Sequence, residues 1–304
     1  MNHYNSYSAC LKERFGIPVL KLPINAGFSC PNRDGTKSLR GCAFCDNRAF
    51  SPVAGTTTPP LEQLQTAIHR AAGRRQAFIA YLQPFSNTYG NVERLRTVYE
   101  PLIRVSGVVG LAVGTRPDCL SDPVYEYLGD LAGRTFLSVE LGLQSSHDTT
   151  LSLINRGHTF DAFAAPVRRL ASMNIDTVAH VILGLPGESP EMMFETAARC
   201  AALPVTGIKI HQLMIIKGTP MEGMFTEGKV EAVSIEKYAP VLCGFIERLR
   251  PDQHIHRIMS DITTAGATGL LIAPEWSAHK QSSLKFLHDY MDANNVVQGS
   301  KYLK

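Results

Sequence analysis

Apolar runs that alternate with amphipathic stretches dominate most of this chain. Six runs are apolar along most of their length, as parallel strands covered on both faces should be. They predict buried strands at 19–24, 78–82, 108–113, 136–143, 178–185 and 208–216. Between them, apolar residues recur on one stripe of a helix, as at Leu61, Leu64 and Ile68. Strands that alternate with helices predict βαβ units.

The spacing of the predicted strands favours a barrel. About six βα units follow one another in series, and no glycine-rich nucleotide fingerprint follows the first strand. We therefore predict an α/β fold, a partial TIM-type (βα)6 barrel over residues 1–230. Residues 231–304 are predicted to form a mostly helical C-terminal extension packed on the barrel.

Composition narrows the protein class. The chain has 304 residues, of which 44% are hydrophobic and 19% charged, so it can bury a sizeable core. Its N-terminus is polar, and no run of 18 or more apolar residues occurs. We predict a cytoplasmic protein without a membrane span. In that reducing compartment, cysteines bind metals or do redox work more often than they form disulfides.

Three of the seven cysteines share one loop-like stretch. Cys42 and Cys45 form a CxxC pair, and Cys30 lies upstream across several turn-forming residues. Three thiolates can hold three irons of a four-iron cluster and leave one metal position open for a ligand that is not protein. The alternatives are a structural zinc with a distant fourth ligand, or simply buried thiols. The other four cysteines are predicted to be small buried hydrophobic residues.

Polar side chains occur near the ends of five successive predicted strands. They are Gln83, Thr115, Arg116, Glu140, Gln144, His180, Lys209 and His211. Active-site groups of βα barrels gather at the carboxyl ends of the strands. An unpaired charge in an apolar strand costs several kcal/mol, so each of these groups needs a partner. The alternative to a site is an internal pair, for example between Glu140 and Lys209.

Seven motifs in order carry a family resemblance. They are GFSCPNRDGT, GCAFC, FSNTYG, GTRPDCL, ELGLQSSHDTTLSLINRGHT, LGLPGES and IKIHQLMIIKGTPM. Together they resemble the radical S-adenosylmethionine (SAM) enzymes, in particular the YhcC/YtqA-like family. A more distant resemblance is to the elongator catalytic subunit and to oxygen-independent coproporphyrinogen oxidases.

The resemblance implies cofactors and the residues that hold them. Cys30, Cys42 and Cys45 would ligate a [4Fe–4S] cluster whose fourth iron chelates SAM. Gln144 and Arg156 stand at the spacing of two SAM contacts in the coproporphyrinogen oxidase type. Arg156 is assigned to the methionine carboxylate, because a guanidinium suits a carboxylate.

Four further side chains are candidate SAM contacts. Glu140 is a candidate for a ribose or substrate contact, and Thr115 follows the predicted strand that ends at Val113. The Gly-Gly-Glu stretch that usually receives the SAM amino group is absent, and Gln83 stands in its place. His180 stands where the coproporphyrinogen oxidase type has an aspartate.

The implied activity is reductive cleavage of SAM to methionine and a 5′-deoxyadenosyl radical. A low-potential donor of the flavodoxin or ferredoxin type would supply the electron. Because the elongator-like enzymes act on wobble uridine, tRNA is the predicted substrate, with a small molecule or peptide as the alternative. A non-catalytic barrel braced by a metal, which binds nucleic acid or a partner, is the other alternative. The net charge of +3 is compatible with a polyanion. So are the basic residues that could contact its phosphates: the arginine pairs at 74–75 and 168–169, the cluster of His254, His256 and Arg257, and Lys280, Lys285, Lys301 and Lys304.

Overall fold

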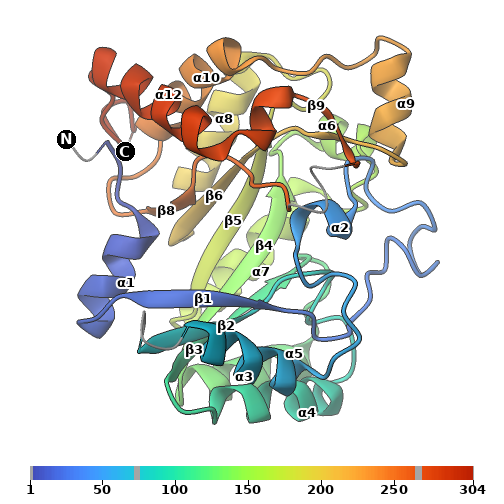
Figure 1. The fold of residues 1–304 in the computed structure, drawn as a ribbon, viewed down its shortest axis with the longest axis vertical. Helices are drawn as coiled ribbons and strands as arrows, with labels where there is room; N and C mark the ends of the chain where they lie inside the picture. The colour runs from blue at the N-terminus through green and yellow to red at the C-terminus, as the bar shows by residue number, and fades with distance from the viewer. Residues whose placement is uncertain (1–2, 72–75, 264–268, 304) are drawn as a thin grey trace.

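Seven parallel strands form one curled sheet in which each strand lies beside the next along the chain. The computed structural model describes residues 3–71, 76–263 and 269–303. The sheet order β1-β2-β3-β4-β5-β6-β8 has the bounds Val19–Ile24, Ala77–Leu82, Val108–Thr115, Phe136–Gln144, Asp176–Leu183, Gly207–Gln212 and His254–Arg257. The sheet curls into half a barrel (Figure 1). The predicted partial TIM-type barrel is confirmed, as are its six strands.

Helices pack around the sheet, and the longer ones between its strands bury an apolar stripe against its outer face. Their bounds are Tyr7–Phe15 (α1), Asn47–Phe50 (α2), Pro60–Ala71 (α3), Val92–Ile103 (α4), Asp122–Ala132 (α5), Asp148–Leu153 (α6), Phe160–Ser172 (α7), Pro190–Ala201 (α8), Pro220–Thr226 (α9), Ile235–Glu247 (α10) and Lys280–Ala293 (α12). Leu64, Tyr99, Leu128 and Phe163 are completely buried between helices and sheet. Each stripe therefore fixes its helix against the strands.

Helix α1 lies across the gap between the two edge strands of the half-barrel (Figure 1). The residue before it, Ser6, forms a parallel bridge with Ile255 of β8. The ring of Tyr7 stacks on His256, with 3.7 Å between the ring centroids. The N-terminal helix thus joins the first strand to the last strand of the sheet.

The C-terminal part contributes both helices and strands. Helices α10 and α12 share the core of the barrel through Phe245, Leu287 and Met291. The predicted run at 208–216 splits into β6 and β7 (Ile215–Ile216), and β7 pairs with β9 (Leu271–Ala273). Strand β8 lies within the predicted extension but completes the main sheet, and the boundary at residue 230 stays a prediction. In the described parts of the chain, no helix has the length and apolarity needed to cross a membrane.

Candidate active site

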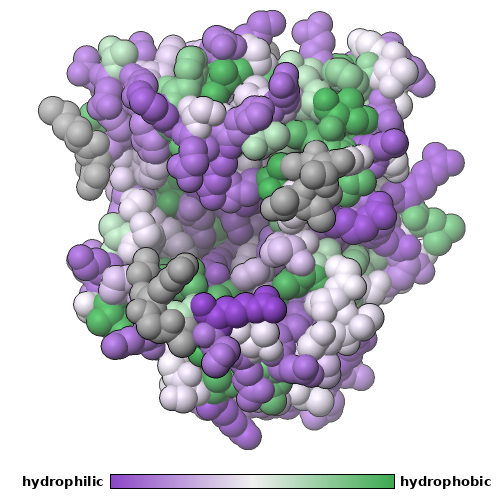
Figure 2. Space-filling model, in the orientation of Figure 1, coloured by the Kyte–Doolittle hydropathy of each residue, from purple (hydrophilic) through white to green (hydrophobic). Residues whose placement is uncertain are grey.

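The carboxyl ends of the parallel strands open into one cavity. All eight polar side chains at the predicted strand ends line it: Gln83, Thr115, Arg116, Glu140, Gln144, His180, Lys209 and His211. Cys30, Cys42 and Cys45 line the same cavity. On the face shown in Figure 2, the molecule is hollowed between α12 and β1, and hydrophilic residues line the hollow. The structure therefore brings the predicted metal ligands and the predicted SAM contacts to one place.

The loop after β1 carries the three cysteines and is held by turns. The amide of Arg33 donates to the carbonyl of Cys30 at 2.8 Å, and the amide of Cys45 donates to the carbonyl of Cys42 at 3.0 Å. Between them, Gly41 has a φ of 71°, which a residue without a Cβ adopts at little cost. These turns fold the chain back, so that all three thiols reach the cavity.

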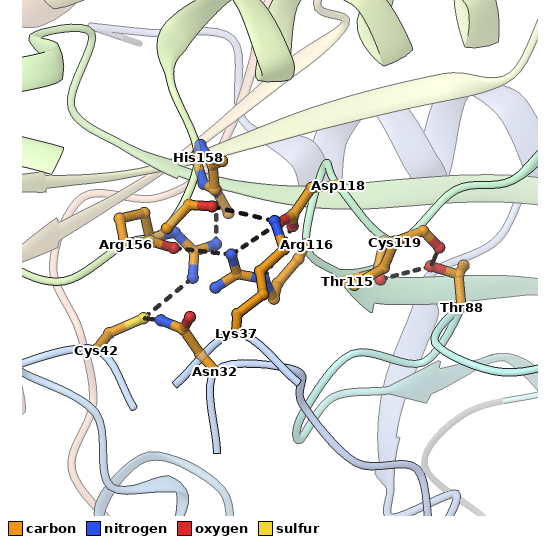
Figure 3. Close-up of polar contacts among 12 residues, drawn as sticks. Asn32, Lys37, Cys42, Thr88, Thr115, Arg116, Asp118, Cys119, Arg156 and His158 are labelled. Atoms are coloured by element: carbon orange, nitrogen blue, oxygen red, sulfur yellow. Dashed lines mark hydrogen bonds and ion pairs between the residues drawn. The ribbon is translucent and has the colours of Figure 1, made fainter. Parts of the chain in front are cut away.

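The sulfur of Cys42 accepts two side-chain hydrogen bonds (Figure 3). Arg156 Nη1 lies 3.3 Å from this sulfur, and Asn32 Nδ2 lies 3.4 Å from it. Arg116 donates to the backbone carbonyl of Arg156 at 2.8 Å and forms a bidentate ion pair with Asp118. The donors around this sulfur suit a thiolate, because hydrogen bonds to sulfur stabilise its negative charge and tune a bound cluster.

We name Cys30, Cys42, Cys45, Asn32 and Arg156 the cysteine site, and its donor set fits an iron–sulfur cluster. Burial and the neighbouring Cys42 raise the pKa of the Cys45 thiol to about 12, so this thiol needs a bound metal to become a thiolate at neutral pH. Within residues 3–71, 76–263 and 269–303, no three His, Cys, Asp or Glu side chains lie close enough to hold one metal ion. A multi-iron cluster spreads its thiolate ligands over several irons, so they need not converge on one point.

Arg156 lies between the cysteine loop and the end of β4. Its Nη2 donates to the carbonyl of Gly142 at 2.7 Å, and its Nε is buried without a partner among the described residues. A Cβ on Gly142 would lie 2.3 Å from that Nη2, so the guanidinium fits only because residue 142 is glycine. The buried donor beside the sulfur agrees with a carboxylate-binding role for Arg156, which stays a prediction.

Gln144 ends β4 in a strained conformation. Its φ is 79°, and the pairing of β4 with β5 shifts register between Gly142 and Gln144. Left-handed backbone is uncommon for a residue with a Cβ, and bulges of this kind redirect side chains beside active sites. The side chain of Gln144 lines the cavity and makes no hydrogen bond within the described ranges. Its amide is therefore available to a ligand.

Gln83 and Thr115 also line the cavity, but their side chains already form hydrogen bonds with other protein groups. Gln83 Nε2 donates to the carbonyl of Phe50 at 3.1 Å, and its Oε1 accepts from the Ser51 hydroxyl at 3.4 Å. The hydroxyl of Thr115 lies 2.6 Å from that of Thr88 (Figure 3). A SAM contact through either residue would have to share these bonds, and both assignments stay predictions.

Glu140 is completely buried at the centre of an ionic cluster. Lys21 donates to its Oε1, while Lys209 and His180 reach its Oε2 at 2.9 Å and 2.8 Å. Lys209 also donates to the Tyr81 hydroxyl at 2.9 Å. We name Lys21, Tyr81, Glu140, His180 and Lys209 the Glu140 cluster. The internal pair of Glu140 with Lys209, which the sequence offered as the alternative, is present.

The charges around Glu140 determine the protonation state of His180. Burial and the nearby Lys209 hold the pKa of His180 well below its ordinary value, so the ring is neutral near pH 7. A neutral ring that meets a carboxylate must carry its proton on the nitrogen that faces it. His180 therefore donates to Glu140 through Nε2, and its role as a SAM contact stays a prediction.

Sequence reasoning missed Lys21 and Arg257 as parts of this site. Lys21 is a charged residue within an apolar strand, as Glu140 and Lys209 are, so the same pattern could have identified it as a candidate site residue. Arg257 belongs to β8, whose alternation of polar and apolar residues does not resemble a buried strand. Arg257 lines the cavity, and its Nη2 lies 2.9 Å from His211 Nδ1.

The basic residues proposed for contacts with a polyanion are scattered. Arg168 is exposed on α7, whereas Arg169 pairs with Asp122 at 2.5 Å. Arg74, Arg75 and Lys304 lie outside the described residues. No continuous basic surface follows from the described members of this set.

Comparison with known proteins places the chain in a family. Residues 30–200 match the Radical SAM superfamily, and residues 205–293 match the Radical_SAM C-terminal domain. Protein YtqA of Bacillus subtilis strain 168 is 40% identical over 302 residues, which cover 97% of this chain and 92% of YtqA. The tRNA uridine(34) acetyltransferase of Dehalococcoides mccartyi strain CBDB1 is 28% identical over 180 residues, which cover 57% of this chain and 37% of that protein.

A solved structure agrees with the fold. The archaeal Elp3 of Methanocaldococcus infernus, with an N-terminal deletion, superposes with a TM-score of 0.69 at 17% identity. The match covers 92% of this chain and 64% of that chain. The chain therefore belongs to the radical SAM superfamily, within the YhcC/YtqA-like family that its motifs indicated, and it is a radical SAM enzyme.

Proposed function

We propose that this enzyme holds a [4Fe–4S] cluster through Cys30, Cys42 and Cys45 and reductively cleaves SAM to a 5′-deoxyadenosyl radical. The observation that carries the proposal is the convergence of these three thiols on the cavity at the carboxyl ends of the strands. We also propose that a donor of the flavodoxin or ferredoxin type supplies the electron. The proposed substrate is a wobble uridine of tRNA.

The residues of the chain bind, orient and shield the reactants in this scheme. Arg156 and Asn32 donate to the sulfur of Cys42, and donors of this kind raise the reduction potential of a cluster. Gln144 presents a free amide to SAM from a fixed bulge. Bound together, the cluster and SAM would supply the radical chemistry, while the cavity walls exclude water.

The tRNA part of the proposal is supported by a relative. The Dehalococcoides protein is named for its action on uridine 34 of tRNA, and its similarity covers 57% of this chain. Charge gives little additional support, because the net charge is only +3. A small molecule or peptide would use the same cavity.

Cluster and SAM chemistry are tested on protein reconstituted without oxygen. The wild-type protein should bind iron and sulfide, turn brown and, once reduced, convert SAM to 5′-deoxyadenosine. Cys42→Ala should lose both the cluster and the product. Cys10→Ala, at a thiol on α1 outside the cavity, should keep both. A colourless protein that binds zinc instead would contradict the proposal.

The substrate is tested by profiling the nucleosides of total tRNA from a deletion strain. A modified uridine should disappear, or its precursor should accumulate, and the wild-type gene should restore it whereas the Cys42→Ala gene should not. An unchanged uridine profile would contradict the tRNA assignment. In that case, the SAM cleavage assay still decides on the radical chemistry.

A further inference from the structure

Among the described residues inside the half-barrel, three cations, Lys21, Lys209 and Arg257, lie around one carboxylate, that of Glu140. Lys21 and Lys209 both bond to Glu140, so one carboxylate serves two ammonium groups. Arg257, from the neighbouring strand β8, adds a third cation to the same interior. A guanidinium stays charged at any physiological pH. Glu140, the carboxylate of the Glu140 cluster, already pairs with both lysines, so this cluster does not compensate the charge of Arg257.

Of these three cations, Arg257 is the one that has no acidic partner among the described residues. Among the described residues, no carboxylate oxygen lies within 4.0 Å of its guanidinium, and its buried Nε makes no hydrogen bond. Its Nη2 donates to His211 instead. Asp261, the nearest acid along the chain, is partly exposed and pairs with Lys280 at 2.8 Å. Leaving a charge unpaired inside a protein is costly, and this cost is removed when an anion binds.

The histidines around this interior do not supply the missing negative charge. Burial and the neighbouring Arg257 hold the pKa of His211 well below its ordinary value, and burial with Lys21 does the same for His256. Both rings are neutral, so they act only as donors or acceptors. His211 Nδ1 also lies 2.6 Å from the Ser260 hydroxyl, which places a second polar group beside the arginine.

The cationic groups are accessible from the cavity. Arg257, Lys209, His211 and Ser260 all line it, and they belong to β6, to β8 and to the segment that follows β8. The cysteine loop, in contrast, follows β1, and the predicted SAM contacts Gln144 and Arg156 come from the end of β4 and the segment after α6. A molecule bound at Arg257 therefore lies in the same cavity as SAM but contacts other elements.

We propose that the cavity binds its substrate through an anionic group, a carboxylate or a phosphate, that pairs with Arg257 and accepts hydrogen bonds from Lys209 and Ser260. A planar guanidinium with free donors is suited to both anions. The inference rests on the proposed function, because it takes this cavity to be where the substrate meets the radical. It makes Arg257 a substrate-positioning residue and assigns the carboxylate of SAM to Arg156.

Anion binding is measured on the reconstituted wild-type protein at constant ionic strength, with chloride replaced by inorganic phosphate in one series and by acetate in another. At least one of these anions should raise the melting temperature in a saturable manner, and the anion that does so identifies a phosphate or a carboxylate. Arg257→Gln should weaken the binding of that anion at least tenfold. Lys285→Gln, at an exposed residue on α12, should bind it as the wild type does.

A second measurement does not depend on the folding of a variant. Phenylglyoxal modifies accessible guanidinium groups, and the bound anion should slow modification of Arg257 while Arg168, exposed on α7, reacts at an unchanged rate. SAM should leave the bound anion in place. Binding no stronger than that of chloride, equal binding by Arg257→Gln, or displacement of the anion by SAM would overturn the inference. Cleavage of SAM by the wild type is assayed separately, so failure of this inference is distinguished from failure of the proposed function.

Discussion

The cysteine site and the Glu140 cluster both contribute side chains to the lining of one cavity, but the polar groups of the two sets find their hydrogen-bond partners differently. In the Glu140 cluster, every charged group has a partner inside the protein: Glu140 alone is contacted by two lysines and a histidine. In the cysteine site, the buried Nε of Arg156 has no partner in the described part of the chain. The nearby Gln144 has a strained backbone and a side-chain amide that likewise bonds to no described residue. The first arrangement is typical of an internal brace and the second of a binding site.

The largest effect on stability is expected for Glu140→Gln. This change leaves two buried lysines without their carboxylate, and breaking such a pair costs about 3–5 kcal/mol. Urea unfolding should show this loss, whereas Glu227→Gln, in an exposed pair with Lys229, should cost less than about 1 kcal/mol. If Glu140→Gln instead leaves stability unchanged and weakens SAM binding, Glu140 belongs to the cofactor site and the distinction between the two regions fails.

Acid should destabilise the barrel interior through its histidines. Burial and the nearby Lys21 lower the pKa of His254 from 6.5 to about 4. In the unfolded chain, His254 binds a proton near pH 6.5, whereas in the folded chain it binds one only near pH 4. The stability of the fold therefore falls as the pH falls from 6.5 to 4. This residue alone accounts for about 3 kcal/mol.

The pH effect is measured by urea unfolding of the wild type and of His254→Gln between pH 8 and pH 4. The variant should lose stability less steeply below pH 6.5 than the wild type, and above pH 7 the two slopes should agree. Parallel curves over the whole range would show that His254 is protonated equally in both states, contrary to its burial.

A smaller effect, on SAM binding and not on the amount of bound iron, is expected for Arg156→Ala. A hydrogen bond to a charged group contributes about 1.5–3 kcal/mol, so the affinity for SAM should fall about 10- to 100-fold. Calorimetry on reconstituted protein measures this, and iron content should stay at the wild-type level. Arg94→Ala, at an exposed position on α4, is the control. Unchanged SAM affinity would remove Arg156 from the SAM site.

The smallest effect, with opposite signs for stability and binding, is expected for Gln144→Gly. Glycine tolerates a φ of 79°, so the variant should be more stable by up to about 1 kcal/mol. Its affinity for SAM should fall, because the amide is removed. Asn295→Gly, at another left-handed residue, should leave SAM binding unchanged. A variant that binds SAM normally would show that the bulge at Gln144 does not serve the cofactor.

The βα rhythm was predictable because buried parallel strands have a strong local signal. The six apolar runs match strands of the structure, and the apolar stripe at Leu61, Leu64 and Ile68 matches α3. Strand β8 was not recognised, because His254 and His256 alternate with Ile255 and dilute its hydrophobicity. Its identity as a strand comes from pairing with β6, a contact that no local pattern encodes.

The sequence by itself determined the barrel, the family and the three candidate metal ligands, because periodicity and motif spacing are local properties of the chain. It also indicated that polar groups at strand ends would meet. Only the tertiary structure decided which of them pair with each other. Glu140 is enclosed by Lys21 and Lys209, from strands on either side of β4 in the sheet, whereas Gln144 and Arg257 keep groups that pair with no residue the structure describes. The sheet curls, and this brings strands that are distant in its order close together. This curvature, and not the spacing of residues along any one strand, decides which charged groups pair inside the protein and which can bind a ligand.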